Sequence, residues 1–347
     1  ADLGFGIIDE MLHKGLIADR YQYRDRRSGE VANFEMDLLA DSTRYPFRLQ
    51  LEQYEFTRLV AAVLEGIDCA DLRFNVEAKG FTETAGQVIV QLDTATGEEQ
   101  LPASFLVTAE GARSQIRKAA GIDYLGFTYD EKFLVVSTQF PFEEVFDDLS
   151  WVNYVSDPDE WCVILRTEKI WRVLFPTRPE NVEDEAYLLS DEFIQQRLHH
   201  LWDKEGAYDI GHRTLYNVNQ RVAETYFKGR VLLVGDACHI NNPLGGMGLN
   251  GGVHDAINLV DKIRKIYDGA EAESMFGLYE RQRRQVCVDT VQQQSIRNRK
   301  MMAAKTPQER KLFHDDMRAV VADVKRHHEF VLKSSMIASL RDAEAIN

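Results

Sequence analysis

An aspartate that ends an apolar run and precedes a glycine-rich loop has the clearest chemical potential in this sequence. Asp236 follows VLLV, residues 231–234, whose composition is typical of a strand buried on both faces of an α/β sheet. Open α/β sheets bind ligands outside the carboxyl ends of their strands, and a carboxylate there accepts hydrogen bonds from polyol hydroxyls. A helix or turn cap is the alternative role for Asp236.

The loop after Asp236 is rich in glycine. Its segment GMGLNG, residues 246–251, fits GxGxxG, but it lies about ten residues after the strand and leads into further helix. It is therefore not a dinucleotide fingerprint. Its small residues instead predict exposed N–H groups at a helix N-terminus, where an anionic or carbonyl-rich ligand is stabilised. We expect Asn250 to cap a helix over 253–263; a tight packing loop is the alternative.

The longer segment GDACHINNPLGGMGLNGGVHDAINL resembles the second flavin motif of the group A FAD-dependent aromatic hydroxylases, which have the para-hydroxybenzoate hydroxylase fold. The match includes His239, for which we expect a structural hydrogen-bonding role. It also includes Asp255. The resemblance implies that FAD is bound by Gln53, Asp236, Pro243, Gly245, Gly246, Gly248, Leu249 and Asn250.

Other segments carry the same resemblance. EGARSQIRKAAGI, residues 110–122, is similar to the family's DGxxSxxR motif, with Glu110 where aspartate is usual. That acid is tied in the family to flavin and reduced-nicotinamide contacts. LEQYEFTRLV, residues 51–60, resembles the helix whose glutamine, here Gln53, meets the ribityl chain. WRVLFPTRP resembles a strand of the substrate domain.

The resemblance implies a FAD-dependent monooxygenase. NAD(P)H would reduce FAD, O2 would form a C4a-hydroperoxyflavin, and an aromatic substrate, phenolic or heteroaromatic and acidic, would be hydroxylated. Tyr154 and Trp161 are candidates for the substrate cavity, although aromatic strand residues are equally typical of core. No residue is identified as catalytic, and no histidine has metal-ligand spacing.

Two other functions stay open. A flavin-dependent halogenase or a reductase can share the fold, but the halogenase Trp-x-Trp-x-Ile-Pro segment lacks its second tryptophan in WRVLFP, residues 171–176. A non-catalytic fragment that does not hold FAD is the third possibility, because the family's opening strand–GxGxxG–helix unit is missing here. We expect the chain to be part of a longer one.

Composition excludes several protein classes. The 347 residues carry a net charge of −15, which argues against nucleic acid as a partner. Four widely spaced cysteines without a CxxC pair argue against a disulfide framework or zinc site and fit a cytoplasmic protein. No stretch approaches the roughly 18 apolar residues of a membrane helix. We expect a monomer or homodimer.

The pattern of elements predicts an α/β FAD-binding domain with an inserted β-sheet-rich substrate domain and a C-terminal helical segment. A hairpin is expected around Ser28-Gly29, and Met317 and Val331 are among the apolar residues of a tail expected to pack back on the domains. Helices are expected over 49–64 and 190–202, and strands over 72–76, 87–92, 104–108 and within 133–175. The predicted domains are 1–122 and 223–300 (FAD-binding), 123–222 (substrate) and 301–347 (C-terminal helices).

Overall fold

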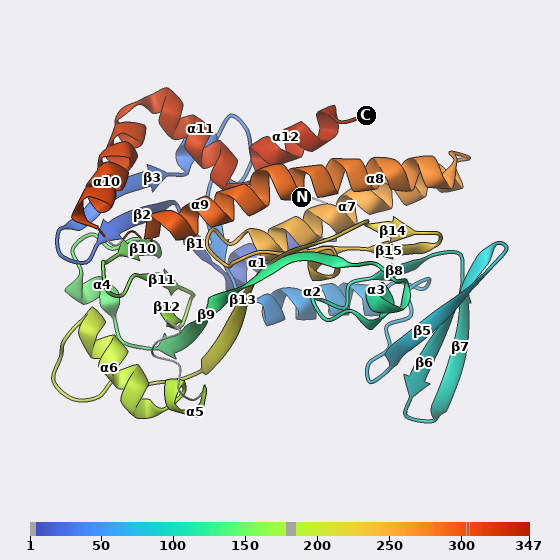
Figure 1. Cartoon of the computed structure of the whole chain (residues 1–347), viewed down its shortest axis with the longest axis horizontal. Coiled ribbons are helices and arrows are strands. Elements are labelled where there is room, and N and C mark those ends of the chain that lie inside the picture. Colours follow the sequence, from blue (N-terminus) through green and yellow to red (C-terminus); the bar gives the residue numbers. More distant parts are fainter. Residues whose placement is uncertain (1–4, 178–184, 303, 305) are drawn as a thin grey trace. The chain divides into compact units, whose positions relative to one another are not determined.

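The computed structural model describes residues 5–177, 185–302, 304 and 306–347. The chain forms two compact units, each assembled from separated segments (Figure 1). Unit 1 comprises Ala1–Leu72, Asp130–Asn217 and Lys300–Ser335. Unit 2 comprises Arg73–Tyr129, Val218–Arg299 and Met336–Asn347.

Unit 1 is built on a mixed sheet with the order β9-β12-β11-β10-β2-β3. Neighbouring strands are antiparallel except for β10 and β2, which run parallel. The hairpin expected around Ser28-Gly29 is present as β2 and β3, and the strands expected within 133–175 correspond to β9 to β12. Their bounds are Arg20–Asp25 (β2), Gly29–Glu35 (β3), Tyr124–Thr138 (β9), Val152–Ser156 (β10), Cys162–Arg166 (β11) and Trp171–Thr177 (β12).

The two faces of this sheet carry different side chains because successive strand residues alternate. One face presents Trp171, Val173 and Phe175 to α6 (Asp191–Leu201), and these side chains are fully buried. Two short helices, α4 (Phe142–Val145) and α5 (Glu185–Leu188), contribute to the same core. Leu198 of α6 completes it.

The other face carries tyrosines on β2 and β10. The helices α10 (Pro307–Ala322) and α11 (Val324–Ser334) cover the β2–β3 end of this face. Phe313 of α10 meets Tyr23 edge-on, with ring centroids 5.4 Å apart, and Phe330 of α11 stacks on Phe34 at 4.5 Å. This part of the expected tail therefore packs on unit 1.

The helix expected over 49–64 is shorter than predicted. Arg48–Gln50 form strand β4, which pairs antiparallel with β1 (Leu16–Ala18), and the helix α2 begins at Gln53 (Gln53–Glu65). The prediction failed because helical spacing in one segment does not reveal a strand partner more than thirty residues earlier. The remaining elements of unit 1 are α1 (Ile7–Lys14) and the 3-10 helix η1 (Asp37–Leu39).

Unit 2 contains the parallel pair that precedes the glycine loop. β15 (Val231–Leu233) lies between β8 (Leu106–Thr108), its parallel neighbour, and β14 (Phe227–Lys228). All three residues of β15 are fully buried, as the apolar run predicted. The long helices α7 (Met247–Tyr267) and α8 (Ala272–Val286) pack against each other, and Leu259, Phe276 and Tyr279 join the core of this unit.

Shorter elements complete this part of unit 2. β16 (His239–Ile240) pairs with the end of β13 (Arg213–Ala223), and α12 (Ile337–Ala345) packs on α8. The others are α3 (Gln115–Ala119), the 3-10 helix η3 (Gly235–Ala237), the π-helix η4 (Cys287–Gln292) and α9 (Gln293–Met302).

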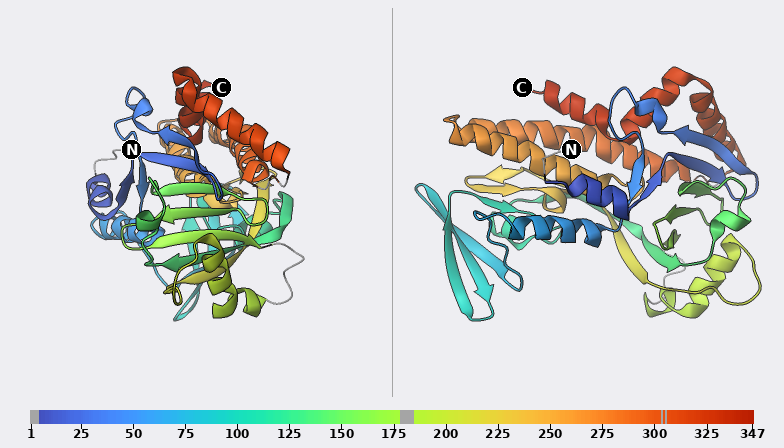
Figure 2. Two further views of the ribbon diagram at one scale, coloured as in Figure 1. Left: turned by 90° about the vertical axis from the view of Figure 1, so that its left-hand side faces the viewer. Right: turned by 180° about the vertical axis from the view of Figure 1, so that it is seen from behind.

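A three-stranded meander also belongs to unit 2, with strands β5 (Glu77–Thr84), β6 (Gln87–Thr94) and β7 (Gly97–Ala103) (Figure 2). The strand expected over 72–76 is absent. Its apolar residues Leu72 and Phe74 are 39% and 71% exposed, so they do not form the buried face that their alternation suggested.

Candidate functional site

Asp236 lies in the sharp turn that follows β15. Gly235 has φ +61°, a left-handed conformation that favours glycine, and it starts η3. Asp236 comes next, at the carboxyl end of the parallel pair β8–β15. Its side chain is exposed, and no group among the described residues donates a hydrogen bond to its carboxylate. It therefore does not act as a cap, and the carboxylate is available to a ligand.

The backbone of this turn is held from its protein side. Tyr124 donates its hydroxyl hydrogen bond to the carbonyl of Asp236 at 2.9 Å, and Arg117 donates to the carbonyl of Ala237 at 3.2 Å. The Arg117 guanidinium also lies 4.0 Å from the centroid of the Tyr124 ring. Although Asp236 is exposed as a residue, the protein partly shields its carboxyl group, and this desolvation raises the pKa of Asp236; the nearby His239 opposes the shift and the charge of Asp255 adds to it.

Glu110, at the expected motif acid, faces its own helix α3. Its Oε2 accepts hydrogen bonds from Thr108 Oγ1 at 2.8 Å, from Ser114 Oγ at 2.5 Å and from the backbone N–H of Ile116 at 3.0 Å. Ser114 in turn caps α3 by accepting from the N–H of Arg117. The longer glutamate side chain thus organises the helix that positions Arg117.

A buried ionic cluster centred on Asp255 ties α7 to the same turn. Asp255 Oδ2 lies 2.7 Å from His239 Nε2 and accepts from the N–H of Gly235 at 3.2 Å, while Oδ1 accepts from Arg283 Nε at 2.8 Å. Burial opposes ionisation, but the imidazole and guanidinium outweigh it, so the pKa of Asp255 is lowered. The pKa of His239 is raised well above its usual value because its Cys287 and Asp255 neighbours outweigh burial.

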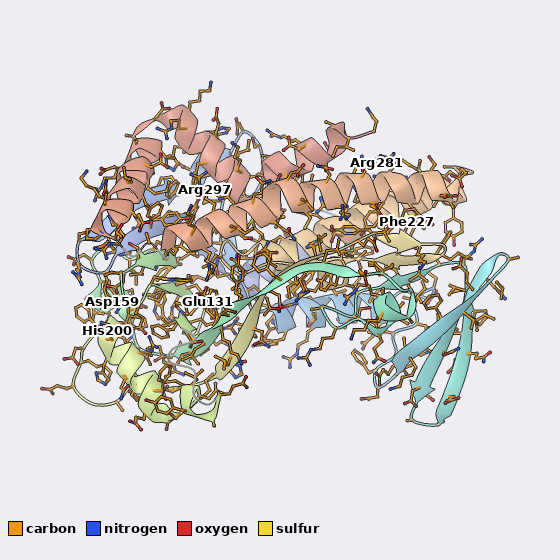
Figure 3. All side chains as sticks on the ribbon, viewed as in Figure 1. Glu131, Asp159, His200, Phe227, Arg281 and Arg297 are labelled. Carbon is orange, nitrogen blue, oxygen red and sulfur yellow. The ribbon has the colours of Figure 1, made fainter. Side chains whose placement is uncertain are left out.

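Sequence reasoning missed Arg283. It lies in the charged run ERQRR, residues 280–284, where nothing distinguishes one arginine from the next. Helical spacing places Tyr279 and Arg283 on one buried face of α8, which was the only usable signal. Arg281, labelled in Figure 3, instead donates to the carbonyl of Asn347 at 3.1 Å.

The glycine loop leads directly into α7. Gly245 and Gly246 have φ +110° and +67°, and α7 begins at Met247, six residues before the expected start at 253. Asn250 therefore lies inside the helix and does not cap it; its amide donates to the carbonyl of Gly246 at 2.8 Å. The prediction failed because the glycines, which disfavour helix interiors, were read as loop.

The start of α7 has an open side and a packed side. A Cβ on Gly246 or Gly248 would meet no atom within 4 Å, whereas one on Gly252 would lie 3.1 Å from Gly235 Cα. Among the described residues no side chain caps this helix N-terminus. Its first-turn N–H groups thus remain available to a ligand beside a helix end that favours negative charge.

The other predicted site residues vary in their surroundings. Pro243 and Leu249 are exposed near the start of α7 in unit 2, whereas Gln53, Tyr154 and Trp161 belong to unit 1. Gln53 is exposed in the first turn of α2. Tyr154 is buried and is hydrogen-bonded to Arg48. Trp161 is buried edge-on against Phe133, with centroids 5.5 Å apart, so it is part of the core.

Within the described ranges, no three His, Cys, Asp or Glu side chains are grouped to hold a metal ion. No described helix has the length and apolar character needed to cross a membrane.

Comparison with known proteins places this geometry among flavoproteins. A family model described as FAD binding domain matches residues 4–294. Para-nitrophenol 4-monooxygenase of a Pseudomonas species (strain WBC-3) is 27% identical over 315 residues, covering 88% of this chain and 76% of the relative. 6-Hydroxy-3-succinoylpyridine 3-monooxygenase HspB of Pseudomonas putida is 22% identical, covering 92% and 81%.

Solved structures agree. The crystal structure of p-nitrophenol 4-monooxygenase PnpA from Pseudomonas putida DLL-E4 superposes with a TM-score of 0.89 at 26% identity, covering 96% of this chain and 84% of that one. Aklavinone-11 hydroxylase in a ternary complex with FAD and aklavinone shares the fold, with a TM-score of 0.74 at 20% identity and coverage of 86% and 59%.

Proposed function

Because this chain belongs to the FAD-binding-domain family and is one of its FAD-dependent aromatic hydroxylases, we propose that the Gly235–Asp236 turn and the start of α7 hold the flavin's ribityl chain and pyrimidine edge. The observation that carries this proposal is the unpartnered Asp236 carboxylate, in the turn that packs against α7, whose first turn is uncapped and open at Gly246 and Gly248. The acceptor oxygens of Asp236 match the hydroxyl groups of FAD, and the N–H donors at the start of α7 match its carbonyl groups.

Each group has a distinct task in this proposal. The Asp236 carboxylate would accept hydrogen bonds from ribityl hydroxyls, and the first-turn N–H groups of Met247, Gly248 and Leu249 would donate to pyrimidine carbonyl oxygens. Gly245 and Gly246 permit the left-handed backbone that precedes the helix, and Pro243 and Leu249 border it. For Gln53, in the first turn of α2, the family resemblance supports a contact of its amide with the ribityl chain.

When bound, FAD supplies the oxygen chemistry, with NAD(P)H as the reductant. The protein's part is to orient the ring system and to stabilise negative charge near the start of α7. The helix dipole does this directly. Beneath it, His239 and Arg283 share the single buried carboxylate of Asp255.

We also propose that the substrate is a phenolic ring and that O2 is the co-substrate, as the names of the relatives support. Para-nitrophenol 4-monooxygenase and pentachlorophenol 4-monooxygenase are both named for phenols. All four cysteines are free, which supports a reducing cytoplasm as the location. A monomer or homodimer remains our expectation.

Purified protein titrated with FAD, followed by flavin fluorescence and absorbance, tests the cofactor proposal without turnover. The FAD-loaded protein is then mixed with NADH or NADPH and a panel of phenols, phenolic acids and hydroxypyridines. We expect a subset to stimulate both nicotinamide oxidation and formation of a hydroxylated product. Saturable flavin binding without any such stimulation would contradict the phenol proposal.

A further inference from the structure

Arg48 differs from Arg26 and Arg197, two other partly buried arginines of unit 1. It lies on β4 opposite the buried Ala18 of β1. Arg26 and Arg197 both pair with the buried carboxylate of Glu160. Among the described residues, Arg48 has no carboxylate partner, and the groups that act on it are phenols.

Three tyrosines surround the Arg48 guanidinium. Its central carbon lies 4.0 Å from the centroid of the Tyr21 ring, and Tyr154 accepts a hydrogen bond from it. Tyr23 contributes a further phenol and stacks on Tyr154, with centroids 5.1 Å apart and planes 23° from parallel. A cation over an aromatic face is attracted to it, but the ring does not neutralise its charge. A partly buried cation without a counter-ion is costly, so this position is suited to an incoming anion.

The aromatic surroundings have a fixed geometry. Tyr21 stacks on Phe34 at 5.0 Å, and its hydroxyl is 2.9 Å from Ser334 Oγ. Burial raises the pKa of Tyr21 to about 12, so its phenol stays neutral beside the guanidinium at physiological pH. Tyr21, Tyr23 and Tyr154 project from the same face of the sheet, which gives the cation a wall of aromatic side chains.

We propose that Arg48 and Tyr154 recognise the phenolate oxygen of the aromatic substrate, with Tyr21 holding the guanidinium in place. This inference rests on the proposed function, because an electron-rich phenolate is the form of the ring that accepts an electrophilic oxygen. On binding, the phenol O–H bond breaks and its proton passes to solvent, leaving the anion paired with Arg48. A planar guanidinium and an adjacent phenol together offer N–H and O–H donors to one oxygen.

Binding of 4-nitrophenol to FAD-loaded protein without nicotinamide tests this assignment. Its anion absorbs visible light and its neutral form does not, so difference absorbance below its solution pKa reports the bound ionisation state directly. We expect wild-type protein to raise the anionic fraction. Arg48→Met should abolish that rise and weaken binding about ten- to a hundredfold, and Arg48→Lys should restore part of both.

Two controls separate recognition from folding. Nitrobenzene lacks the hydroxyl and should bind wild type and Arg48→Met alike. Arg58 is the matched control residue, because its guanidinium lies 5.0 Å over the ring of Tyr54 on the exposed side of α2. Arg58→Met should leave both the affinity and the anionic fraction unchanged.

The outcomes are distinguishable from those of the cofactor proposal. Equal wild-type affinity for nitrophenol and nitrobenzene, or an unchanged anionic fraction in Arg48→Met, would overturn the assignment. So would a parallel loss of both probes in Arg48→Met that Arg48→Lys does not restore, since that result indicates a structural role. Failure of the proposed function appears separately, as absence of flavin binding or of phenol-stimulated nicotinamide oxidation.

Discussion

The carboxylate of Asp255 accepts a hydrogen bond at 3.2 Å from the backbone N–H of Gly235, twenty residues earlier in the chain. This contact fixes the third turn of α7 to the start of the turn that presents Asp236. Asp255, which pairs with His239 and Arg283 in the buried cluster, therefore also holds the backbone turn of the proposed flavin site in place.

Replacing Asp255 with Asn should lower the free energy of unfolding by about 3–5 kcal/mol, because Arg283 and His239 would lose their shared buried counter-charge. Denaturant unfolding measures this. Asp315→Asn is the control: it pairs with Lys311 and Arg318 at the surface of α10, and we expect little or no change in the free energy of unfolding. Similar losses in the two variants would show that the cluster is not stabilising. Adding Arg283→Met to Asp255→Asn should recover part of the loss.

Gly248→Ala should separate stability from flavin binding. A Cβ there meets no atom within 4 Å, so the substitution should stabilise the flavin-free protein by up to about 1 kcal/mol through helix propensity. The same methyl group would cover the open N–H groups and weaken FAD affinity. Gly252→Ala is the contrasting variant, since its Cβ would press on Gly235 backbone and cost about 1–3 kcal/mol. Unchanged FAD affinity in Gly248→Ala would remove the start of α7 from the flavin site.

Asp236→Ala should weaken FAD affinity about ten- to a hundredfold, because a charge-assisted hydrogen bond contributes roughly 1.5–3 kcal/mol. The flavin-free protein should keep its stability, since no described group bonds to this carboxylate. Flavin titration and thermal unfolding provide the two readouts. Asp268→Ala, at the far end of α7, is the exposed control and should change neither. A destabilised flavin-free Asp236→Ala protein would instead indicate a structural role.

His254 should make stability fall in mild acid. Burial, helped by the charge of Arg283, lowers its pKa to about 4. Above about pH 6.5 both folded and unfolded states are neutral at this residue. Between pH 6.5 and 4 His254 becomes protonated in the unfolded chain but stays neutral in the folded state. The free energy of unfolding therefore falls by about 2–3 kcal/mol as the pH falls through this range. His254→Gln should flatten this part of the profile. If the two proteins lose stability in parallel from pH 7 to 4, the titration of His254 is not the cause.

The sequence predicted the strand that ends at the proposed site, but neither the start of α7 nor the charge pairing around it. β15 and the aspartate after it form one continuous motif, so their placement followed from local pattern alone, whereas three of the glycines read as loop lie inside α7. Arg283 and Arg48 were not foreseen because their partners, Asp255 and Tyr154, are distant in sequence and meet them only through tertiary packing. The same limit explains the misplaced start of α2, where pairing of β4 with β1 overrode helical spacing.

The segmented make-up of unit 2 has a consequence for biosynthesis. Gln282 of α8 donates to the carbonyl of Ile346 at 2.8 Å, and α12 packs along the same helix. A nascent chain on the ribosome cannot make these contacts until residues 336–347 have emerged, long after β8 and β15 have been translated. Contacts between residues so distant in sequence form slowly. We therefore expect the side of α8 that faces α12 to stay exposed during synthesis, and this exposed surface can bind chaperones.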